Sequence, residues 1–191
     1  MNFDVFEIKD LSKTNLIKEL KEVEGIAVRT AVLDEEILSQ CFELKIVARH
    51  GVGYDSVDIN YLNRKKIALA VTGTSNAVTV AEHAMTMFLY LAKNIDKSNN
   101  LTKKGDFDKR GDLSDSFELY KKNVLILGFG RIGQAFAKRC LGFEANIYVY
   151  DPFVDKKIIE SLGGKKINNL EEELKETDIL SLSVPLTKDT Y

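Results

Sequence analysis

Three glycines and one aspartate are the residues of this chain whose types and spacing most clearly suggest chemistry. Gly128, Gly130 and Gly133 have the spacing G-x-G-x-x-G and follow an apolar run at 124–127 that is typical of a buried strand. Apolar residues then recur every fourth position, as on one face of a helix, at Ile132, Phe136 and Cys140. A second apolar run ends at Asp151, roughly 20 residues after the first glycine. Strand, glycines, helix, strand and acid in this order are typical of a dinucleotide-binding site.

Each glycine has a separate task in such a site. Gly128 lets the chain turn sharply after the strand, Gly130 lets the backbone approach a pyrophosphate, and Gly133 lets the helix pack closely on the sheet. The N-terminus of that helix offers unpaired N–H groups and a positive dipole end to the phosphates. The alternatives are a glycine-rich turn of another α/β protein and the phosphate loop of a kinase. A kinase loop would be followed by a Val-Ala-Ile-Lys-like lysine and an Asp-Phe-Gly, and the sequence has neither.

Asp151 indicates which dinucleotide binds. Its carboxylate can accept hydrogen bonds from both ribose hydroxyls and would repel a 2′-phosphate. Pro152 and Phe153 follow it, and no arginine is close by in the sequence to hold that phosphate. We therefore expect NAD rather than NADP.

The composition is that of a globular protein with a sizeable core. The 191 residues suit one large domain or two small ones, and 45% of them are hydrophobic. A net charge of −2 gives no electrostatic footprint for nucleic acid or an anionic membrane. Cys41 and Cys140 have neither disulfide nor metal spacing, the first residues do not resemble a signal peptide, and the most apolar segment, 84–92, is too short to span a bilayer. We expect a cytoplasmic protein without a metal site.

Helix and strand signals alternate along the first half of the chain. The pattern predicts strands at 25–28, 46–48 and 67–71, separated by helices that begin near Asp34 and Asp58, with a further helix around Leu16. Such alternation predicts a parallel sheet covered on both faces. A long helix at 79–95 is apolar on most sides, which predicts a position between domains or in a subunit interface.

The polar stretch 96–105 predicts a domain boundary after residue 96. Beyond this polar stretch, up to residue 122, the chain is charged, and we expect an irregular surface arm. Beyond Asp151 the pattern predicts helices at 156–162 and 170–176 and strands at 165–167 and 179–184.

With these segments in order, the chain resembles the D-isomer-specific 2-hydroxyacid dehydrogenases, and most of all their phosphoglycerate dehydrogenase branch. The resemblance extends from Gly25 over nearly the full length. It rests on Gly25-Ile-Ala-Val-Arg-Thr30, Arg49-His-Gly-Val-Gly-Tyr-Asp-Ser-Val-Asp58, Thr79-Val-Ala-Glu-His83, Gly128-Phe-Gly-Arg-Ile-Gly133, Tyr150-Asp-Pro152 and Ser183-Val-Pro-Leu-Thr187. It implies an α/β fold of two parallel-sheet domains that enclose a cleft. Residues 1–96 would form an incomplete flavodoxin-like substrate domain, ending in the helix 79–95, and 97–191 the first part of a Rossmann NAD-binding domain.

The resemblance also implies binding residues. In the second domain Arg131 and Ile132 would meet the pyrophosphate, Asp151 the adenosine ribose, and Val184 and Pro185 the adenine side.

In the first domain, by the same resemblance, the backbone of Val52 and Gly53 would hold the substrate carboxylate, and Arg29 and Arg49 a distal anionic group. A glycine loop such as 51–53 is a plausible anion nest on its own chemistry, and an arginine that ends a strand in an α/β domain points into the usual ligand crevice. The alternative is that both arginines are ordinary surface charges.

Family members begin before the position of Met1 and continue far past Tyr191, where their catalytic arginine, glutamate and histidine lie. This chain offers His50, beside the substrate loop, and His83, in the first turn of a buried helix where a packed role is expected. Neither has an obvious carboxylate partner by spacing, so we assign no catalytic residue.

We therefore expect an NAD-dependent oxidoreductase of D-2-hydroxy acids, with a 3-phosphoglycerate-like acid favoured, present as a fragment that is itself inactive. Its partners would be the small acid and a second copy in a homodimer, and neither nucleic acid nor a membrane. The alternatives are a non-catalytic NAD(H)-binding regulatory protein of the same fold, since some relatives act as corepressors, and another NAD reaction such as formate or phosphite oxidation.

Overall fold

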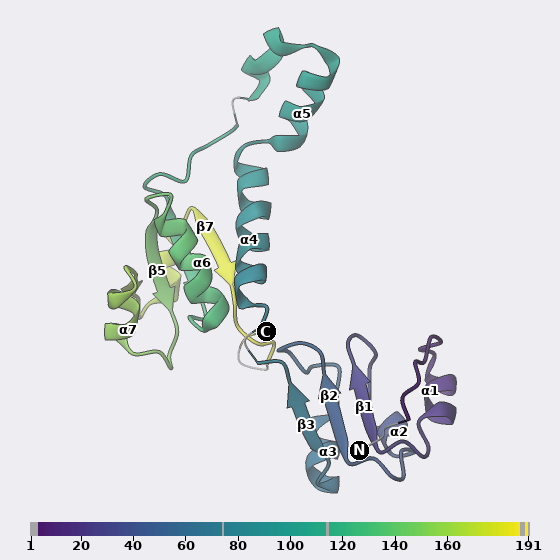
Figure 1. Ribbon diagram of the computed structural model, residues 1–191. Helices are drawn as coiled ribbons and strands as arrows, with labels where there is room; N and C mark the ends of the chain where they lie inside the picture. Colours follow the sequence, from purple (N-terminus) through teal and green to yellow (C-terminus); the bar gives the residue numbers. More distant parts are fainter. Residues whose placement is uncertain (1–3, 74, 114, 188–189, 191) are drawn as a thin grey trace. The chain divides into compact units, whose positions relative to one another are not determined.

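The computed structural model describes residues 4–73, 75–113, 115–187 and 190, which form two compact units, Met1–Ser75 and Asn76–Tyr191 (Figure 1). Each unit has its own parallel sheet, so the predicted α/β fold with two parallel-sheet domains is confirmed. Within these ranges no helix has both the length and the apolar character needed to cross a membrane.

The first unit contains a three-stranded sheet with the order β1-β2-β3. Its strands are β1 (Gly25–Val28), β2 (Ile46–Arg49) and β3 (Ala68–Val71), and its helices are α1 (Lys13–Glu19), α2 (Glu35–Leu38) and α3 (Ile59–Lys65). Asp34 and Asp58 cap α2 and α3, because their carboxylates accept the N–H groups of Ile37 and Tyr61 at 3.0 and 2.9 Å. This strand order is that of one side of a flavodoxin-like sheet.

Only one face of this sheet is covered in the described structure. Ile26, Val28 and Val47 are buried and share one core with apolar residues of all three helices. Ala27 and Ala48, which alternate with them, are exposed. The prediction of a sheet covered on both faces is therefore wrong for this unit as described.

The second unit contains a four-stranded sheet with the order β6-β5-β4-β7. Its strands are β4 (Asn123–Leu127), β5 (Asn146–Tyr150), β6 (Lys165–Lys166) and β7 (Ile179–Leu182), and the helices between and after them are α6 (Arg131–Leu141), α7 (Lys156–Ser161) and α8 (Leu170–Lys175). Numbered from β4, the order is 3-2-1-4, which is the first part of the doubly wound dinucleotide-binding sheet.

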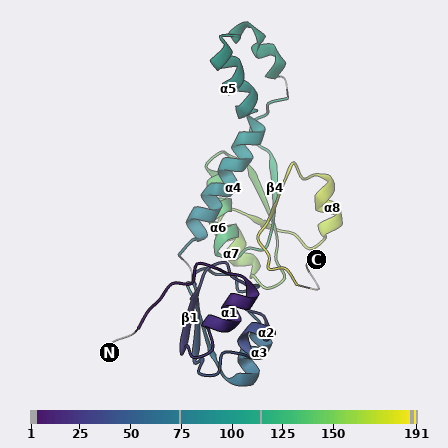
Figure 2. The same cartoon turned by 90° about the vertical axis from the view of Figure 1, so that its right-hand side faces the viewer.

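Helix α4 (Ala77–Ala92) packs alongside α6 within the second unit (Figures 1 and 2). The guanidinium of Arg139 on α6 contacts the carboxylate of Glu82 on α4 at 2.7 Å. The division of the chain therefore falls between Ser75 and Asn76, whereas the polar stretch predicts it after residue 96.

The predicted helix 79–95 is interrupted, because Asn94 adopts a left-handed conformation with φ of 47° and α5 (Ile95–Lys104) starts after it. The prediction that this helix lies between domains or in a subunit interface stays a prediction. Ala81 and Met85 are buried, but Met87 and Leu91 are 52% and 69% exposed. The polar stretch, predicted to be a boundary, forms α5, and a 3-10 helix (Phe107–Leu113) follows it.

Candidate cofactor and substrate sites

Gly128 makes the turn that brings three strand ends together. It follows β4 with φ of +88°, and a Cβ on it would lie 2.7 Å from the carbonyl oxygen of Ser183, after β7. Its N–H donates to the carbonyl of Tyr150, at the end of β5, at 3.0 Å, and the N–H of Ser183 donates to the carbonyl of Leu127 at 2.8 Å. The carboxyl ends of β4, β5 and β7 thus meet where the strand order reverses, which is the usual ligand position in an open α/β sheet.

The other two glycines differ in what surrounds them. A Cβ on Gly133 would lie 2.2 Å from the carbonyl oxygen of Gly128, so α6 sits against the loop without room for a side chain. Around Gly130, by contrast, no described atom outside its two chain neighbours lies within 4 Å of the Cβ position. Gly130 is the N-cap of α6 and has no side chain, so no side-chain cap satisfies the first N–H groups of α6. Open space and unpaired donors at a helix N-terminus fit a pyrophosphate.

Asp151 lies at the end of β5 and binds the glycine loop directly. Its Oδ2 accepts the N–H of Phe129 at 2.7 Å, and its Oδ1 accepts the N–H groups of Phe153 and Val154 at 2.8 and 3.2 Å. Oδ1 already accepts two hydrogen bonds, whereas Oδ2 accepts one and can still accept a further hydrogen bond from a ribose hydroxyl. The spacing of the motif predicts the position of Asp151, but its bond to Phe129 depends on the three-dimensional turn and has no signal in the sequence.

The remaining predicted cofactor residues lie around the same edge. A Cβ on Gly128 would be 2.8 Å from Cγ1 of Val184, so the segment after β7 borders the glycine loop, and Pro185 follows it. Arg131 and Ile132 are the first two residues of α6, with Arg131 exposed and Ile132 partly buried. All eight residues predicted to bind the cofactor are therefore at, or one turn from, the carboxyl edge of this sheet.

The predicted substrate residues gather at the carboxyl edge of the first sheet. Arg49 ends β2, and its neighbour in the parallel register is Val28, the last residue of β1. Arg29 follows Val28 and is exposed, so both arginines leave the sheet at the same edge. Val52 and Gly53 are exposed in the loop after β2. Their N–H groups donate no hydrogen bond to another backbone group of the described residues. The geometry can present two cations and free amides to an anion.

The two histidines and two cysteines do not add a reactive group to these edges. His50 is exposed in the loop after β2. His83 is exposed on α4, so the expectation of a packed histidine is wrong. Burial raises the pKa of the Cys140 thiol to about 12, which keeps it in the unreactive thiol form. In the described ranges no three or more His, Cys, Asp or Glu side chains are grouped so as to hold a metal ion.

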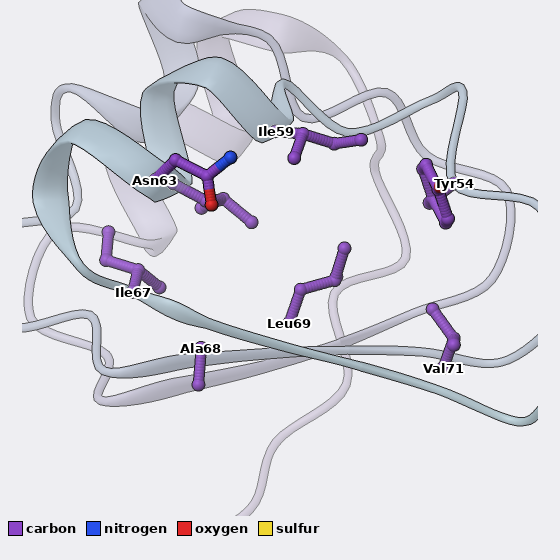
Figure 3. A pocket seen from close by; sticks show the side chains of 8 residues that line it. Tyr54, Ile59, Asn63, Ile67, Ala68, Leu69 and Val71 are labelled. Atoms are coloured by element: carbon purple, nitrogen blue, oxygen red, sulfur yellow. The ribbon is translucent and has the colours of Figure 1, made fainter.

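A hollow of about 520 Å³ lies between α3 and β3 of the first unit (Figure 3). The side chains that line it are apolar apart from the amide of Asn63 and the hydroxyl of Tyr54, and none of the predicted substrate residues is among them. Without a charged group it is a poor site for an organic acid, which favours the strand edge instead.

Comparison with known proteins defines the class to which this arrangement belongs. Residues 85–191 match the sequence profile of the D-isomer specific 2-hydroxyacid dehydrogenase, NAD binding domain. The chain is 32% identical to the D-3-phosphoglycerate dehydrogenase of Methanocaldococcus jannaschii over 94% of the chain and 34% of that protein. It is 33% identical to the glyoxylate reductase of Pyrococcus furiosus over 96% of the chain and 56% of that protein.

Among solved structures, a D-lactate dehydrogenase from Aquifex aeolicus, complexed with NAD and lactic acid, matches with a TM-score of 0.84 and 33% identity. The match covers 92% of this chain and 52% of that one. The chain belongs to the D-isomer specific 2-hydroxyacid dehydrogenase family, and it carries the NAD-binding domain of that family, so the predictions of family and of NAD as the cofactor are confirmed. It spans between about a third and about half of the length of these relatives.

Proposed function

We propose that the gene product containing this chain is an NAD-dependent oxidoreductase of D-2-hydroxy acids, and that a phosphorylated acid such as 3-phosphoglycerate is its substrate. The observation that carries the substrate class is the pair Arg29 and Arg49 at one strand edge, next to the exposed loop of Val52 and Gly53. Loop amides suit a carboxylate, and guanidinium groups suit phosphate because their planar donors can bind it in pairs.

In this proposal the chain binds and orients. NAD, when bound, supplies the hydride acceptor for the acid. The first N–H groups of α6 bind the pyrophosphate, and Asp151 orients the adenosine ribose while it fixes the loop through Phe129. The amides of Val52 and Gly53 hold the substrate carboxylate. These contacts act through positioning and electrostatics, and we assign proton transfer to no residue of the chain.

Arg29 tests the substrate class. In the gene's full-length product, Arg29→Ala should raise the KM for a phosphorylated acid about tenfold or more, because a charge-assisted hydrogen bond is lost. The KM for an acid without a distal charge should change little. Arg64→Ala is the matched control, since Arg64 is an exposed arginine of the same unit that pairs with Glu35 at 2.7 Å. An equal effect of Arg29→Ala on both substrates would show that Arg29 is structural.

A non-catalytic NAD(H)-binding regulator is the second candidate. Its support is that the glycine loop and Asp151, the residues assigned to the cofactor, serve NADH binding and not proton transfer. The regulator would bind NADH and change a partner's behaviour without oxidising the cofactor. Turnover of NADH with any 2-oxo acid by the full-length product excludes this candidate.

A homodimer is part of the proposal. Its support is one side of α4, where Met87 and Leu91, four residues apart, are more than half exposed. Light scattering of the full-length product should give twice the monomer mass, and a monomer at micromolar concentration would contradict it.

A further inference from the structure

Gly51 determines where the guanidinium of Arg49 lies. A Cβ on Gly51 would be 1.2 Å from Nη1 and 2.5 Å from Cζ of Arg49, so the guanidinium fills the volume that any side chain at position 51 would need. Gly51 is also buried, with φ of +150°, a conformation that residues with a Cβ rarely adopt.

The backbone at Gly51, against which the Arg49 guanidinium lies, is hydrogen-bonded to segments next to both neighbouring strands. The N–H of Gly51 donates to the carbonyl of Arg49 at 3.0 Å, and its carbonyl accepts the N–H of Thr72, after β3, at 3.1 Å. The N–H of His50 donates to the carbonyl of Val28, at the end of β1, at 2.8 Å. These hydrogen bonds connect the backbone at Gly51 to the ends of all three strands.

The guanidinium itself is only partly satisfied in this folded pose. Its Nη1 donates to the carbonyl of His50 at 3.1 Å. Its Nε is buried and has no hydrogen-bond partner among the residues that the structure describes. A buried donor without a partner is costly, so this pose leaves Nε with a hydrogen bond still to make.

We infer that Gly51 is a specificity-determining residue, because its missing side chain holds Arg49 folded at the strand edge, where Arg49 selects acids that carry a distal negative charge. The inference rests on the proposed function. A side chain at position 51 meets the tip of a flexible arginine first, so it displaces the guanidinium before it displaces the backbone. The selection for the distal charge should then be lost, while the Val52 and Gly53 amides remain available to the carboxylate.

The test is a double-mutant cycle on the gene's full-length product. NADH oxidation is measured with phosphohydroxypyruvate and with hydroxypyruvate, which lacks the phosphate, and the readout is the ratio of the two kcat/KM values. Arg49→Ala and Gly51→Ala should each lower this ratio about tenfold to a hundredfold, the value of a charge-assisted contact. The double variant should lower it no further, because Gly51 acts through Arg49.

Gly73→Ala is the control for backbone strain, because it also places a side chain at a residue with a positive φ. Gly73 has a φ of +53°, but no described atom outside its chain neighbours lies within 4 Å of its Cβ position, so the ratio should not change. An unchanged ratio in Gly51→Ala, with a lowered ratio in Arg49→Ala, overturns the role of Gly51 alone. Additive losses in the double variant do the same. An unchanged ratio in Arg49→Ala overturns the distal-anion part of the proposed function and this inference together.

A second measurement covers the case in which Gly51→Ala does not fold. In the NMR spectrum of the unmutated protein, the Arg49 Nε–H signal, assigned by its loss in Arg49→Lys, should show a contact to the Gly51 Hα protons and shift when inorganic phosphate is added. Absence of the contact to Gly51 overturns the inference. A contact without any response to phosphate overturns the selection role of Arg49.

Discussion

At the scale of single residues, Asp151 has two tasks that a substitution separates. Asp151→Ala should weaken NADH binding and narrow the affinity gap to NADPH by about 1–3 kcal/mol, the value of a lost polar contact. NADPH should not gain much, because the Phe129 N–H loses its acceptor at the same time. The chain has no tryptophan, so bound NADH can be followed by its own fluorescence without energy transfer from indole.

Asp155→Ala is the control for Asp151→Ala. Asp155 is a nearby carboxylate that caps α7 by accepting the N–H of Lys157 at 2.7 Å. Asp155→Ala should leave the affinities for NADH and NADPH unchanged. Equal affinity of the unmutated chain for NADH and NADPH would contradict the role of Asp151 in choosing the cofactor.

Two glycines of the same loop should respond to alanine in different ways, one mainly in stability and the other mainly in NADH binding. Gly133→Ala forces a Cβ against the backbone carbonyl of Gly128 and should lower the free energy of unfolding by about 1–3 kcal/mol, as overpacking does. Gly130→Ala meets open space and should cost about 1 kcal/mol or less, a change of N-cap residue. It should nevertheless weaken NADH binding, since the pyrophosphate must approach there. Urea denaturation and NADH titration measure the two effects, and a Gly130→Ala variant with unchanged NADH affinity would argue against pyrophosphate at this position.

The sequence predicts the tasks of these glycines but not the poses of the side chains around them. The G-x-G-x-x-G spacing implies a turn, an open position and a close packing, and the structure shows each at the glycine concerned. The contacts of Arg49 and Asp151 depend on the conformation of the turns that carry them. Those turns are held by residues far apart in the sequence, so a local pattern does not predict the contacts. Only the folded loop shows that Gly51 lies under a guanidinium.

At the scale of secondary-structure elements, Asp178 joins the beginnings of β4 and β7. Its carboxylate accepts the ammonium of Lys122 and the N–H of Asn123, both at 2.8 Å. The Lys122 hydrogen bond, and after it the Asn123 N–H, lowers the pKa of Asp178 below its ordinary value of 3.8. A lowered pKa stabilises the fold above that ordinary value, and the contribution disappears as the pH falls through the folded-state pKa.

Asp178→Asn should therefore destabilise the chain at pH 7 by about 0.5–1 kcal/mol, a value discounted because the pair is partly exposed. The difference between variant and unmutated chain should vanish as the pH is lowered below the ordinary aspartate range. Urea denaturation followed by circular dichroism at several pH values measures it. A difference that persists unchanged at acid pH would show that the carboxylate charge is not the cause.

The strands were easier to predict from the sequence than the segment between the sheets. Short apolar runs such as 124–127 give strands in either unit, and Asp34 and Asp58 mark helix starts because their side chains cap them. The helix 79–95 could not be delimited, because Asn94 is polar and unremarkable in sequence, yet it takes the left-handed conformation that ends α4. The polar stretch 96–105 has the composition of a linker and equally that of an exposed helix, and it forms α5.

At the scale of the whole molecule, packing rather than composition decides where the chain divides. Helix α4 has an apolar side that contacts α6, and the Arg139–Glu82 pair joins the two helices, so α4 belongs to the second unit. A sequence pattern identifies that this helix must be buried somewhere, but it does not say against which partner. The relatives are two to three times as long as the matched region, so the activity of the whole protein stays a proposal.

The 191-residue chain by itself should bind NADH but should not oxidise it measurably. A positioned acid or base contributes about 10²–10⁴-fold to such a reaction, and no residue of the chain is assigned that role. NADH oxidation should be compared between this chain and a version extended to the end of its gene, across several 2-oxo acids. NADH binding by the short chain is the control for a folded second unit. Comparable rates from the two versions would refute the prediction, and the search for a base within the chain would then begin with His50, which lies beside the loop of Val52 and Gly53.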